Sequence, residues 1–248
     1  MKIVIPMAGP EPQFSKIGQI KALVEIADKP MIELVVDNLK SIRDDAEFIF
    51  VIRKEICRKY HLDDVLKLLV PNATIVTAQN DTAGAACTAM LAIDHLQDND
   101  PMIITNGDQL IQTDLNKAMT DLTLRNLDAG TIVFESIHPR WSYVLVDENQ
   151  LVVEAAEKWP ISKMATAGFY YFKQAGDFIE AVGNMLQKQA SVNDWYYVCP
   201  TFNELILKQK RIGIHQIKRT EYISLATPEG VEAYSQSLRG NHRTGKDE

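Results

Sequence analysis

The chain has 248 residues, of which 46% are hydrophobic, and its 26 Lys and Arg residues are outnumbered by 33 Asp and Glu residues. The resulting formal net charge of −7 argues against non-specific nucleic-acid binding, which depends on clustered cations. No apolar run approaches the roughly 20 residues that a membrane span requires, so membrane insertion is not expected. Three cysteines without C-x-x-C spacing predict reduced thiols in a cytoplasmic protein, with no disulfide framework or zinc site.

Short runs rich in Ile, Val and Phe occur through the first half of the chain, and helical patterns separate them. The runs lack polar alternation, which is typical of strands buried in a parallel sheet. They lie at residues 2–8, 47–52, 73–78, 101–107 and 130–136, and the helical patterns lie at 31–42, 64–69 and 84–96. This alternation predicts an α/β fold with a mostly parallel sheet and helices on both faces.

The pattern changes after about residue 134, where a hairpin is predicted. Two strand-like runs within residues 142–158 flank the turn signal DENQ. Further strands are expected at 165–173 and 211–217, and helices at 176–189, 200–210 and 227–238. The last helix is expected to begin with Thr227 as N-cap and Pro228 as its first residue. No linker divides the chain, so we expect a single domain over residues 1–248, with a polar tail at 239–248 that frays.

Polar residues follow several of the predicted strands, at the edge of the sheet where ligands bind in open α/β folds. AGPEPQFSKIGQIK follows the first strand, QNDTAG the third and NGDQ the fourth. Asp108, in NGDQ, is a carboxylate at a strand end, and such a residue can hold Mg²⁺ together with substrate phosphates. NGD is also good turn chemistry, so Asp108 could instead cap a turn.

Six segments, in chain order, resemble those of the sugar-phosphate nucleotidylyltransferases: IPMAG...KALVEIADKPMIELVVDNL, ITNGDQ, LVVEAAEKWPIS, ATAGFYYF, YYVCPTFNELI and TPEGVEAY. The resemblance covers nearly the whole chain and is greatest to a branch found in bacterial capsule and lipopolysaccharide biosynthesis. It implies a Rossmann-like, glycosyltransferase-A-like fold with a nucleotide-binding half at 1–134 and an acceptor-binding half at 135–238. It also implies an enzyme that joins an NTP to a sugar 1-phosphate or similar small phosphorylated acceptor and releases pyrophosphate. A homo-oligomer is compatible with the sequence.

The resemblance implies which residues of the first half act on the nucleotide. Lys21 and Asp108 would be catalytic, Lys21 on the phosphates and Asp108 as the ligand of a Mg²⁺ cofactor. The implied nucleotide-binding residues are Ala8, Gly9, Gln13, Gln79, Gly84 and Asn106. Taken alone, Lys21 also fits an exposed surface lysine, and the turn between Gln79 and Gly84 also fits a simple lead into a helix.

The acceptor residues implied by the resemblance lie in the second half of the chain. Glu157 would bind a hydroxyl group, Lys158 the acceptor phosphate, and Gly168 would let the acceptor approach the backbone, with Asn203 as a further substrate-binding residue. Adjacent residues of a strand point to opposite faces, so Glu157 and Lys158 could instead be a solvated pair. The aromatic residues Trp141, Tyr143, Trp159 and Trp195 either line this pocket or belong to the core.

The first loop departs from the family pattern, which is glycine-rich and carries an arginine. Here Glu11 brings a negative charge, Pro12 removes a backbone donor and Gln13 replaces the cation. Pro200 also stands near the point where many relatives have a second metal-binding aspartate. Three hypotheses follow: an active enzyme whose loop uses Lys16 or Lys21 instead, a binding or regulatory protein of the same fold, and a glycosyltransferase, which the single acid of NGDQ disfavours.

Overall fold

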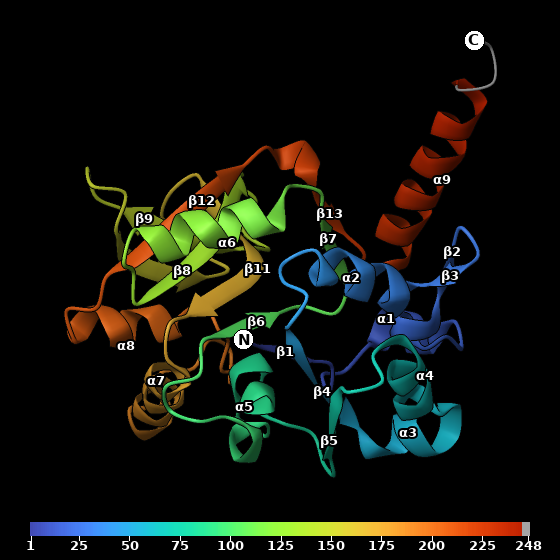
Figure 1. The fold of residues 1–248 in the computed structure, drawn as a ribbon, viewed down its shortest axis with the longest axis horizontal. Coiled ribbons are helices and arrows are strands. Elements are labelled where there is room, and N and C mark those ends of the chain that lie inside the picture. Colours follow the sequence, from blue (N-terminus) through green and yellow to red (C-terminus); the bar gives the residue numbers. More distant parts are fainter. Residues whose placement is uncertain (245–248) are drawn as a thin grey trace.

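The computed structural model of the chain describes residues 1–244, and its centre is a nine-stranded mixed sheet (Figure 1). Seven strands follow one another in the order β10-β9-β11-β6-β1-β4-β5, while β8 pairs with β11 and β12 pairs with β8. The strands are β1 (Lys2–Pro6), β4 (Glu47–Arg53), β5 (Thr74–Ala78), β6 (Met102–Thr105), β8 (Ala129–Glu135), β9 (Ser142–Val146), β10 (Val152–Glu157), β11 (Met164–Phe172) and β12 (Ile212–Ile217). Two short ribbons lie beside the sheet, β2 (Glu25–Ile26) with β3 (Lys29–Pro30) and β7 (Gln109–Ile111) with β13 (Tyr222–Ser224).

Strands β6, β1, β4 and β5 are parallel, and β11 runs antiparallel between β6 and β8. Because β8 pairs in parallel with β12, the predicted mostly parallel α/β sheet is confirmed, with β10 and β11 as its antiparallel strands. In β1 the central residues Ile3, Val4 and Ile5 are fully buried, since helices cover both faces. Ile3 and Ile5 join one hydrophobic core and Val4 the other, as the alternation of strand side chains requires.

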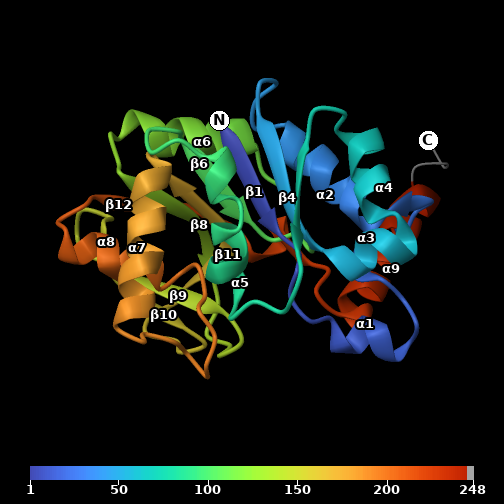
Figure 2. The same ribbon diagram turned by 90° about the horizontal axis from the view of Figure 1, so that it is seen from below.

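Nine α-helices are described, and they cover the two faces of the sheet. The helices are α1 (Pro12–Lys16), α2 (Met31–Lys40), α3 (Lys54–Tyr60), α4 (Leu62–Leu69), α5 (Ala85–Met90), α6 (Leu115–Leu124), α7 (Ala175–Gln187), α8 (Thr201–Leu207) and α9 (Pro228–Thr244). Helices α2 and α6 lie above the sheet in Figure 1, and α5 and α7 lie below it. In Figure 2 α5 and α7 lie on the near side of the strands.

The predicted ends of several elements are found in the structure. The hairpin forms as β9 and β10, and Thr227 caps α9 by accepting a hydrogen bond at 3.2 Å from the Gly230 N–H. Helix α6 was not predicted, although Asp114 caps it by accepting from the Lys117 N–H at 2.9 Å. Helix α9 continues to Thr244, so residues 239–244 are helical where a frayed tail was expected. Residues 245–248 lie outside the described part of the chain.

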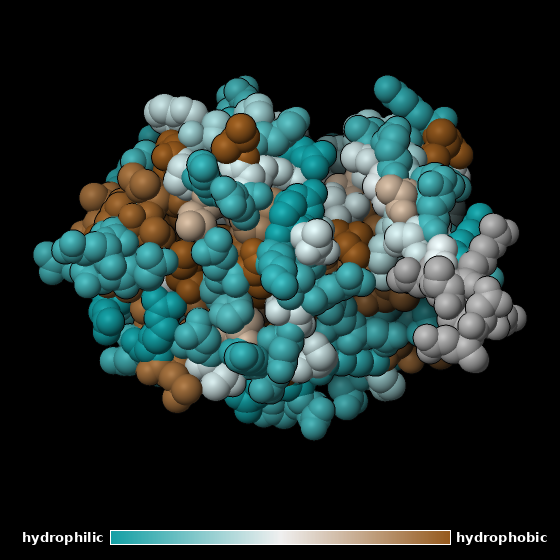
Figure 3. Space-filling view, turned by 90° about the horizontal axis from the view of Figure 1, so that it is seen from above, coloured by the Kyte–Doolittle hydropathy of each residue, from teal (hydrophilic) through white to brown (hydrophobic). Residues whose placement is uncertain are grey.

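The surface seen from above the view of Figure 1 is mostly hydrophilic, with hydrophobic side chains gathered at the end away from α9 (Figure 3). Helix α9 projects from the body of the molecule (Figure 1). Across the described residues, none of the helices combines the length and the apolar character needed to cross a membrane.

Candidate active site

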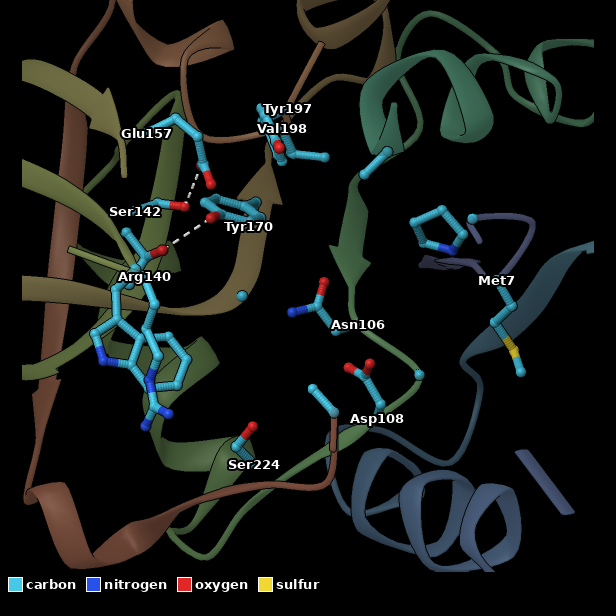
Figure 4. A pocket seen from close by; sticks show the side chains of 18 of the residues that line it. Met7, Asn106, Asp108, Arg140, Ser142, Glu157, Tyr170, Tyr197, Val198 and Ser224 are labelled. Atoms are coloured by element: carbon cyan, nitrogen blue, oxygen red, sulfur yellow. Dashed lines mark hydrogen bonds between the residues drawn. The ribbon is translucent and has the colours of Figure 1, made fainter. Parts of the chain in front are cut away.

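A cavity of about 370 Å³ opens where β1 and β6 end (Figure 4). One wall consists of the loops after these two strands and the start of α5, and the other consists of the adjoining ends of β9 and β10, the middle of β11 and β13. The charged side chains that line it are Glu11, Lys21, Asp108, Arg140, Glu157 and Lys158. Three acids therefore face the same space as three bases, and their pairing decides what the cavity can bind.

Lys21 forms ion pairs with two acids at the centre of this site. Its Nζ lies 2.7 Å from Asp108 Oδ2 and 3.4 Å from Glu11 Oε1, and the three side chains are only 19–21% exposed. Burial favours the neutral amine, but the two carboxylates outweigh it and raise the pKa of Lys21. Lys21 is therefore a partly buried, protonated cation, and the alternative of an exposed surface lysine is wrong.

Glu157 and Lys158 both line the cavity, although they are neighbours in the sequence. Strand β10 ends at Glu157, and Lys158 has a left-handed backbone with φ of 56°, so the alternation of a strand no longer applies to it. Ser142 Oγ donates to Glu157 Oε2 at 2.5 Å, and Lys158 Nζ donates to the Tyr197 hydroxyl at 2.6 Å. Burial raises the pKa of Glu157, and the Ser142 hydrogen bond and the Lys158 charge partly offset this effect.

Gly168 lies at the back of the cavity, in a position that excludes a side chain. Its φ is 60°, and an added Cβ would lie 2.2 Å from Asn106 Nδ2. Asn106 Nδ2 donates to Gln109 Oε1 at 3.1 Å, and Gln109 Nε2 donates to the Gly168 carbonyl at 3.1 Å. The buried Gln109 side chain also accepts from the Tyr222 hydroxyl at 3.2 Å. This network holds Asn106 in the wall next to Asp108, as Figure 4 shows.

Gly84 lies at a second opening of about 260 Å³, which shares Gly9, Pro10, Ala85 and Tyr197 with the main cavity. The φ of Gly84 is 119°, and an added Cβ would lie 2.4 Å from the carbonyl oxygen of Tyr196. Glycine is therefore required at the start of α5. Trp195 and Tyr197 also line this opening, and aromatic side chains can stack on a flat ring.

The structure does not bring Gln13 and Gln79 to either cavity. Gln13 is exposed on α1, which begins at Pro12 and directs Gln13 away from the lining. Gln79 is also exposed and accepts a hydrogen bond from Lys54 Nζ at 2.7 Å. Ala8 is buried beneath the loop, where its carbonyl accepts from Arg53 Nε at 2.9 Å. Of the first-loop residues, Gly9, Pro10 and Glu11 line the cavity instead.

Asn203 does not line the cavity either, because its side chain binds the backbone of β10. Its Oδ1 accepts from the Ala155 N–H at 2.9 Å, and its Nδ2 donates to the Ala155 carbonyl at 2.8 Å. Pro200 precedes α8 and does not line the cavity. Of the four aromatic residues singled out from the sequence, Trp141 lines the main cavity and Trp195 the second opening, whereas Tyr143 is fully buried and Trp159 is 67% exposed.

Several lining residues were missed by sequence reasoning. Arg140 and Tyr197 lie in loops, where no periodicity marks them, and Ser224 ends the short strand β13, which was not predicted. Ser224 is opposite Gln109 in the β13–β7 ladder, and the Leu225 N–H donates to the Asp108 carbonyl at 2.8 Å. The only signal that could have found Ser224 is its position just before the cap of α9.

The oxygen donors near Lys21 fit one kind of metal ion. Within the part of the chain that the structure describes, no group of three or more His, Cys, Asp or Glu side chains is placed to hold a metal. Two carboxylates, Asp108 and Glu11, share Lys21 and face the cavity. Because Mg²⁺ is commonly held by one or two carboxylates together with substrate phosphates, these residues fit a Mg²⁺ ion that the nucleotide helps to bind.

Comparison with known proteins identifies the family. The sequence profile described as nucleotidyl transferase matches residues 17–201, so the chain belongs to this family. The predicted resemblance to nucleotidylyltransferases is thereby confirmed. Among curated protein sequences, none matches the chain significantly.

Solved structures agree with this assignment. The nucleoside-diphosphate-sugar pyrophosphorylase of Vibrio cholerae RC9 is 26% identical, with a TM-score of 0.84 over 94% of this chain and 99% of its own. A putative glucose-1-phosphate thymidylyltransferase of Bacillus anthracis, in complex with a sucrose, is 20% identical with a TM-score of 0.73 over 96% and 94%. A UDP-glucose pyrophosphorylase complexed with UDP-glucose is 17% identical with a TM-score of 0.77 over 97% and 98%. The predicted nucleotidyltransferase fold is thereby confirmed.

Proposed function

We propose that this protein transfers a nucleoside monophosphate from an NTP to a sugar 1-phosphate or a similar small phosphorylated acceptor and releases pyrophosphate. The observation that carries the proposal is the Lys21–Asp108 ion pair of 2.7 Å in a cavity shared by the two halves of the chain. The fold similarity to the pyrophosphorylase of Vibrio cholerae supports it. A role in making precursors of surface polysaccharides in the cytoplasm is part of the proposal.

The nucleotide is assigned to the side of the cavity formed by the loop after β1 and the start of α5. The opening at Gly84 would take the base, and Gly9 would let the phosphates pass close to the loop. Asn106 and Ala85, which line the main cavity, would lie along the path from the base to Asp108. This assignment replaces Gln13 and Gln79 as nucleotide contacts.

The acceptor is assigned to the opposite wall. Glu157 can accept hydrogen bonds from sugar hydroxyls on the oxygen that Ser142 leaves free, and Gly168 allows a ring to lie against β11. Lys158, held by the Tyr197 hydroxyl, carries a charge that can bind the acceptor phosphate. Glu157 and Ser142 are paired across the β10–β9 ladder, and this pairing holds both residues in place.

Transfer requires the acceptor phosphate oxygen to attack the α-phosphorus of the NTP while the bond to pyrophosphate breaks. Lys21 would stabilise the charge that develops on the phosphates, and it can do so because its pKa is raised and it stays protonated. Asp108 and Glu11 would hold a Mg²⁺ ion, which when bound supplies positive charge to neutralise the phosphates. The walls of the cavity orient the two substrates, and orientation is the main requirement of phosphoryl transfer.

Pyrophosphate release tests the proposal. The protein is incubated with each of the four NTPs, Mg²⁺ and a panel of sugar 1-phosphates, and release is followed by a coupled assay. We expect release with at least one pair and none when either substrate is left out. No release with any pair, combined with a thermal shift on NTP binding, would instead support a binding or regulatory protein.

That second function has one observation in its favour. Glu11 faces the cavity and contacts Lys21, so a negative charge lies where phosphates are expected to pass. A protein that keeps the fold but binds NTP weakly would show this arrangement as well. The assay above separates the two, because only the enzyme releases pyrophosphate.

A further inference from the structure

Another cavity, of about 670 Å³, lies beside the main cavity, next to β13 and the first turns of α9. It is distinct from the opening at Gly84 and is called the second cavity below, with the main cavity as the first. Arg140, Tyr222 and Ser224 line both cavities, so the two adjoin at this wall. The transfer proposed above uses only the first cavity. The residues that line the second cavity therefore give independent information about further chemical groups of a bound substrate.

Two arginines and one acid line this second cavity. They are Arg140, Arg219 and Glu229. Arg219 Nη1 donates to the Tyr222 carbonyl at 2.8 Å, and neither guanidinium forms an ion pair with a carboxylate of the described residues. A guanidinium has five N–H donors, so both arginines keep donors that can bind an anion. The lining carries a net positive charge.

An aromatic cluster holds both guanidinium groups in place. Arg140 Cζ lies 4.2 Å from the centre of the Trp141 ring, and Arg219 Cζ lies 5.1 Å from that of Phe134 and 5.6 Å from that of Tyr222. Phe134 and Tyr222 stack at 4.6 Å, and Trp141 meets each of them edge-on at 5.4 Å. Stacking fixes the plane of a guanidinium and leaves its edge free for bidentate binding of a carboxylate or phosphate.

The loop that carries Arg140 is tethered on both sides. The Arg140 N–H donates to His138 Nδ1 at 3.2 Å, and the Tyr143 hydroxyl donates to the His138 carbonyl at 2.7 Å. The Lys158 N–H donates to the Trp141 carbonyl at 3.0 Å. Arg140 is exposed, so an anion can reach it, and the tethers reduce the entropy lost when it binds one.

Arg140 lies on the acceptor side of the site. In Figure 4 it is grouped with Ser142 and Glu157, across Asp108 from Met7 and the first loop. Arg140 lines both cavities, and Arg219 stacks on Tyr222, which also lines both, so the two arginines lie at the wall that the cavities share. A group bound between them would be attached to the acceptor.

We propose that Arg140 and Arg219 form a subsite for a second anionic group of the acceptor, a carboxylate or a phosphate, in addition to the phosphate that attacks the nucleotide. This inference rests on the proposed function, because it assumes that the acceptor occupies the first cavity. It narrows the substrate class to sugar 1-phosphates that carry a further negative charge.

Equilibrium binding tests the subsite without requiring turnover. Glucose 1-phosphate, glucose 1,6-bisphosphate and glucuronic acid 1-phosphate are titrated into the protein by calorimetry. We expect the two probes with a second anionic group to bind at least about tenfold more tightly, which corresponds to about 1.4 kcal/mol. Arg140→Gln and Arg219→Gln should each abolish most of that difference. Arg211→Gln, which removes an exposed arginine outside these cavities, should leave it unchanged.

Three results would overturn the subsite. The first is equal binding of all three probes by the unaltered protein, and the second is the same loss in the Arg211 control. The third is a loss of NTP binding in Arg140→Gln with the probe preference intact, which would assign Arg140 to the triphosphate. Pyrophosphate release is measured alongside, and its absence despite a clear binding preference would contradict the proposed reaction while supporting the subsite.

Discussion

The two walls of the main cavity are built in different ways. The acceptor wall comes from strand ends, where Glu157 pairs with Ser142 in the β10–β9 ladder and Gly168 lies within β11. The first-loop wall comes from the segment after β1, in which Met7, Gly9, Pro10 and Glu11 line the cavity. Side chains on a ladder have their direction fixed by the register, whereas those in the loop depend on local turns. The two walls should therefore respond differently to substitution.

Asp108 lies in the turn after β6, and its substitution should have the largest effect on the rate of pyrophosphate release. Asp108→Asn keeps the shape but removes the charge that pairs with Lys21 and that is proposed to hold Mg²⁺. We expect the rate of pyrophosphate release to fall by about 10³-fold, as when a charge-stabilising group is removed from an active site. Circular dichroism checks that the variant is folded. A rate within tenfold of the unaltered protein would remove Asp108 from the catalytic site.

Gly168 tests how rigid the acceptor wall is. Alanine there adds a Cβ at 2.2 Å from Asn106 Nδ2 with φ at 60°, so we expect a loss of about 2–4 kcal/mol in the free energy of unfolding. Gly183, in α7, has nothing within 4 Å of an added Cβ, and alanine at this control position should stabilise by about 0.5–1 kcal/mol. Urea unfolding measures both. Equal changes in the free energy of unfolding for the two variants would mean that the wall shifts to accommodate the added Cβ.

The ionisation of Glu157 should make both the stability of the protein and the binding of the acceptor depend on pH. Burial raises its pKa, so the folded state keeps this proton at pH values where the unfolded state has lost it. Its contribution therefore makes stability fall as the pH rises from the usual glutamate range through the raised pKa. Acceptor binding has the opposite trend, because sugar hydroxyls need the ionised form, and KM for the acceptor should fall over the same window.

Glu157→Gln should remove this pH dependence of KM and raise KM by about 10- to 100-fold, as expected for a lost hydrogen bond to a charged group. The KM for the NTP is the internal control and should not change. An unaltered pH profile in the variant would show that another group titrates.

The first loop should give the smallest effects, and they should differ between two nearby positions. Glu11→Gln removes a carboxylate proposed to hold Mg²⁺ and also a negative charge that repels the phosphates, so the two effects oppose each other and we expect KM for the NTP to change by no more than a few-fold. Gln13→Arg adds a cation on the exposed side of α1 and should change KM by less than about twofold. Steady-state kinetics at low ionic strength measure both. A larger effect at Gln13 would mean that α1 rearranges to bring this residue into the site.

The sheet and the residues at its strand ends could be predicted because burial and strand ends are local properties. The runs at β1, β4, β6 and β8 are rich in buried apolar residues, Asp108 follows the run at β6, and Glu157 ends the hairpin strand β10. The pairing of the strands then brings the residues at their ends to one edge of the sheet. The hairpin followed from its turn signal in the same way.

The residues that were misplaced are those whose partners lie far away in the sequence. Gln79 binds Lys54, and Asn203 binds Ala155, and no pattern in the chain announces either partner. Gln13 was misplaced for a local reason, because Pro12 starts a helix that turns it outward. Arg140 was overlooked since a tethered loop, rather than a strand, carries it. Long-range hydrogen bonds decide such positions, and a single sequence does not display them.

The Asn203 contact has a consequence for the assembly of the protein. Strand β10 is the outermost strand on its side of the sheet, and an edge strand with open N–H and C=O groups can pair with another chain. The amide of Asn203 occupies both backbone groups of Ala155, much as a neighbouring strand would. A residue first assigned to the substrate thus closes part of the sheet edge next to the proposed acceptor site, where it leaves fewer backbone groups open to edge-to-edge association.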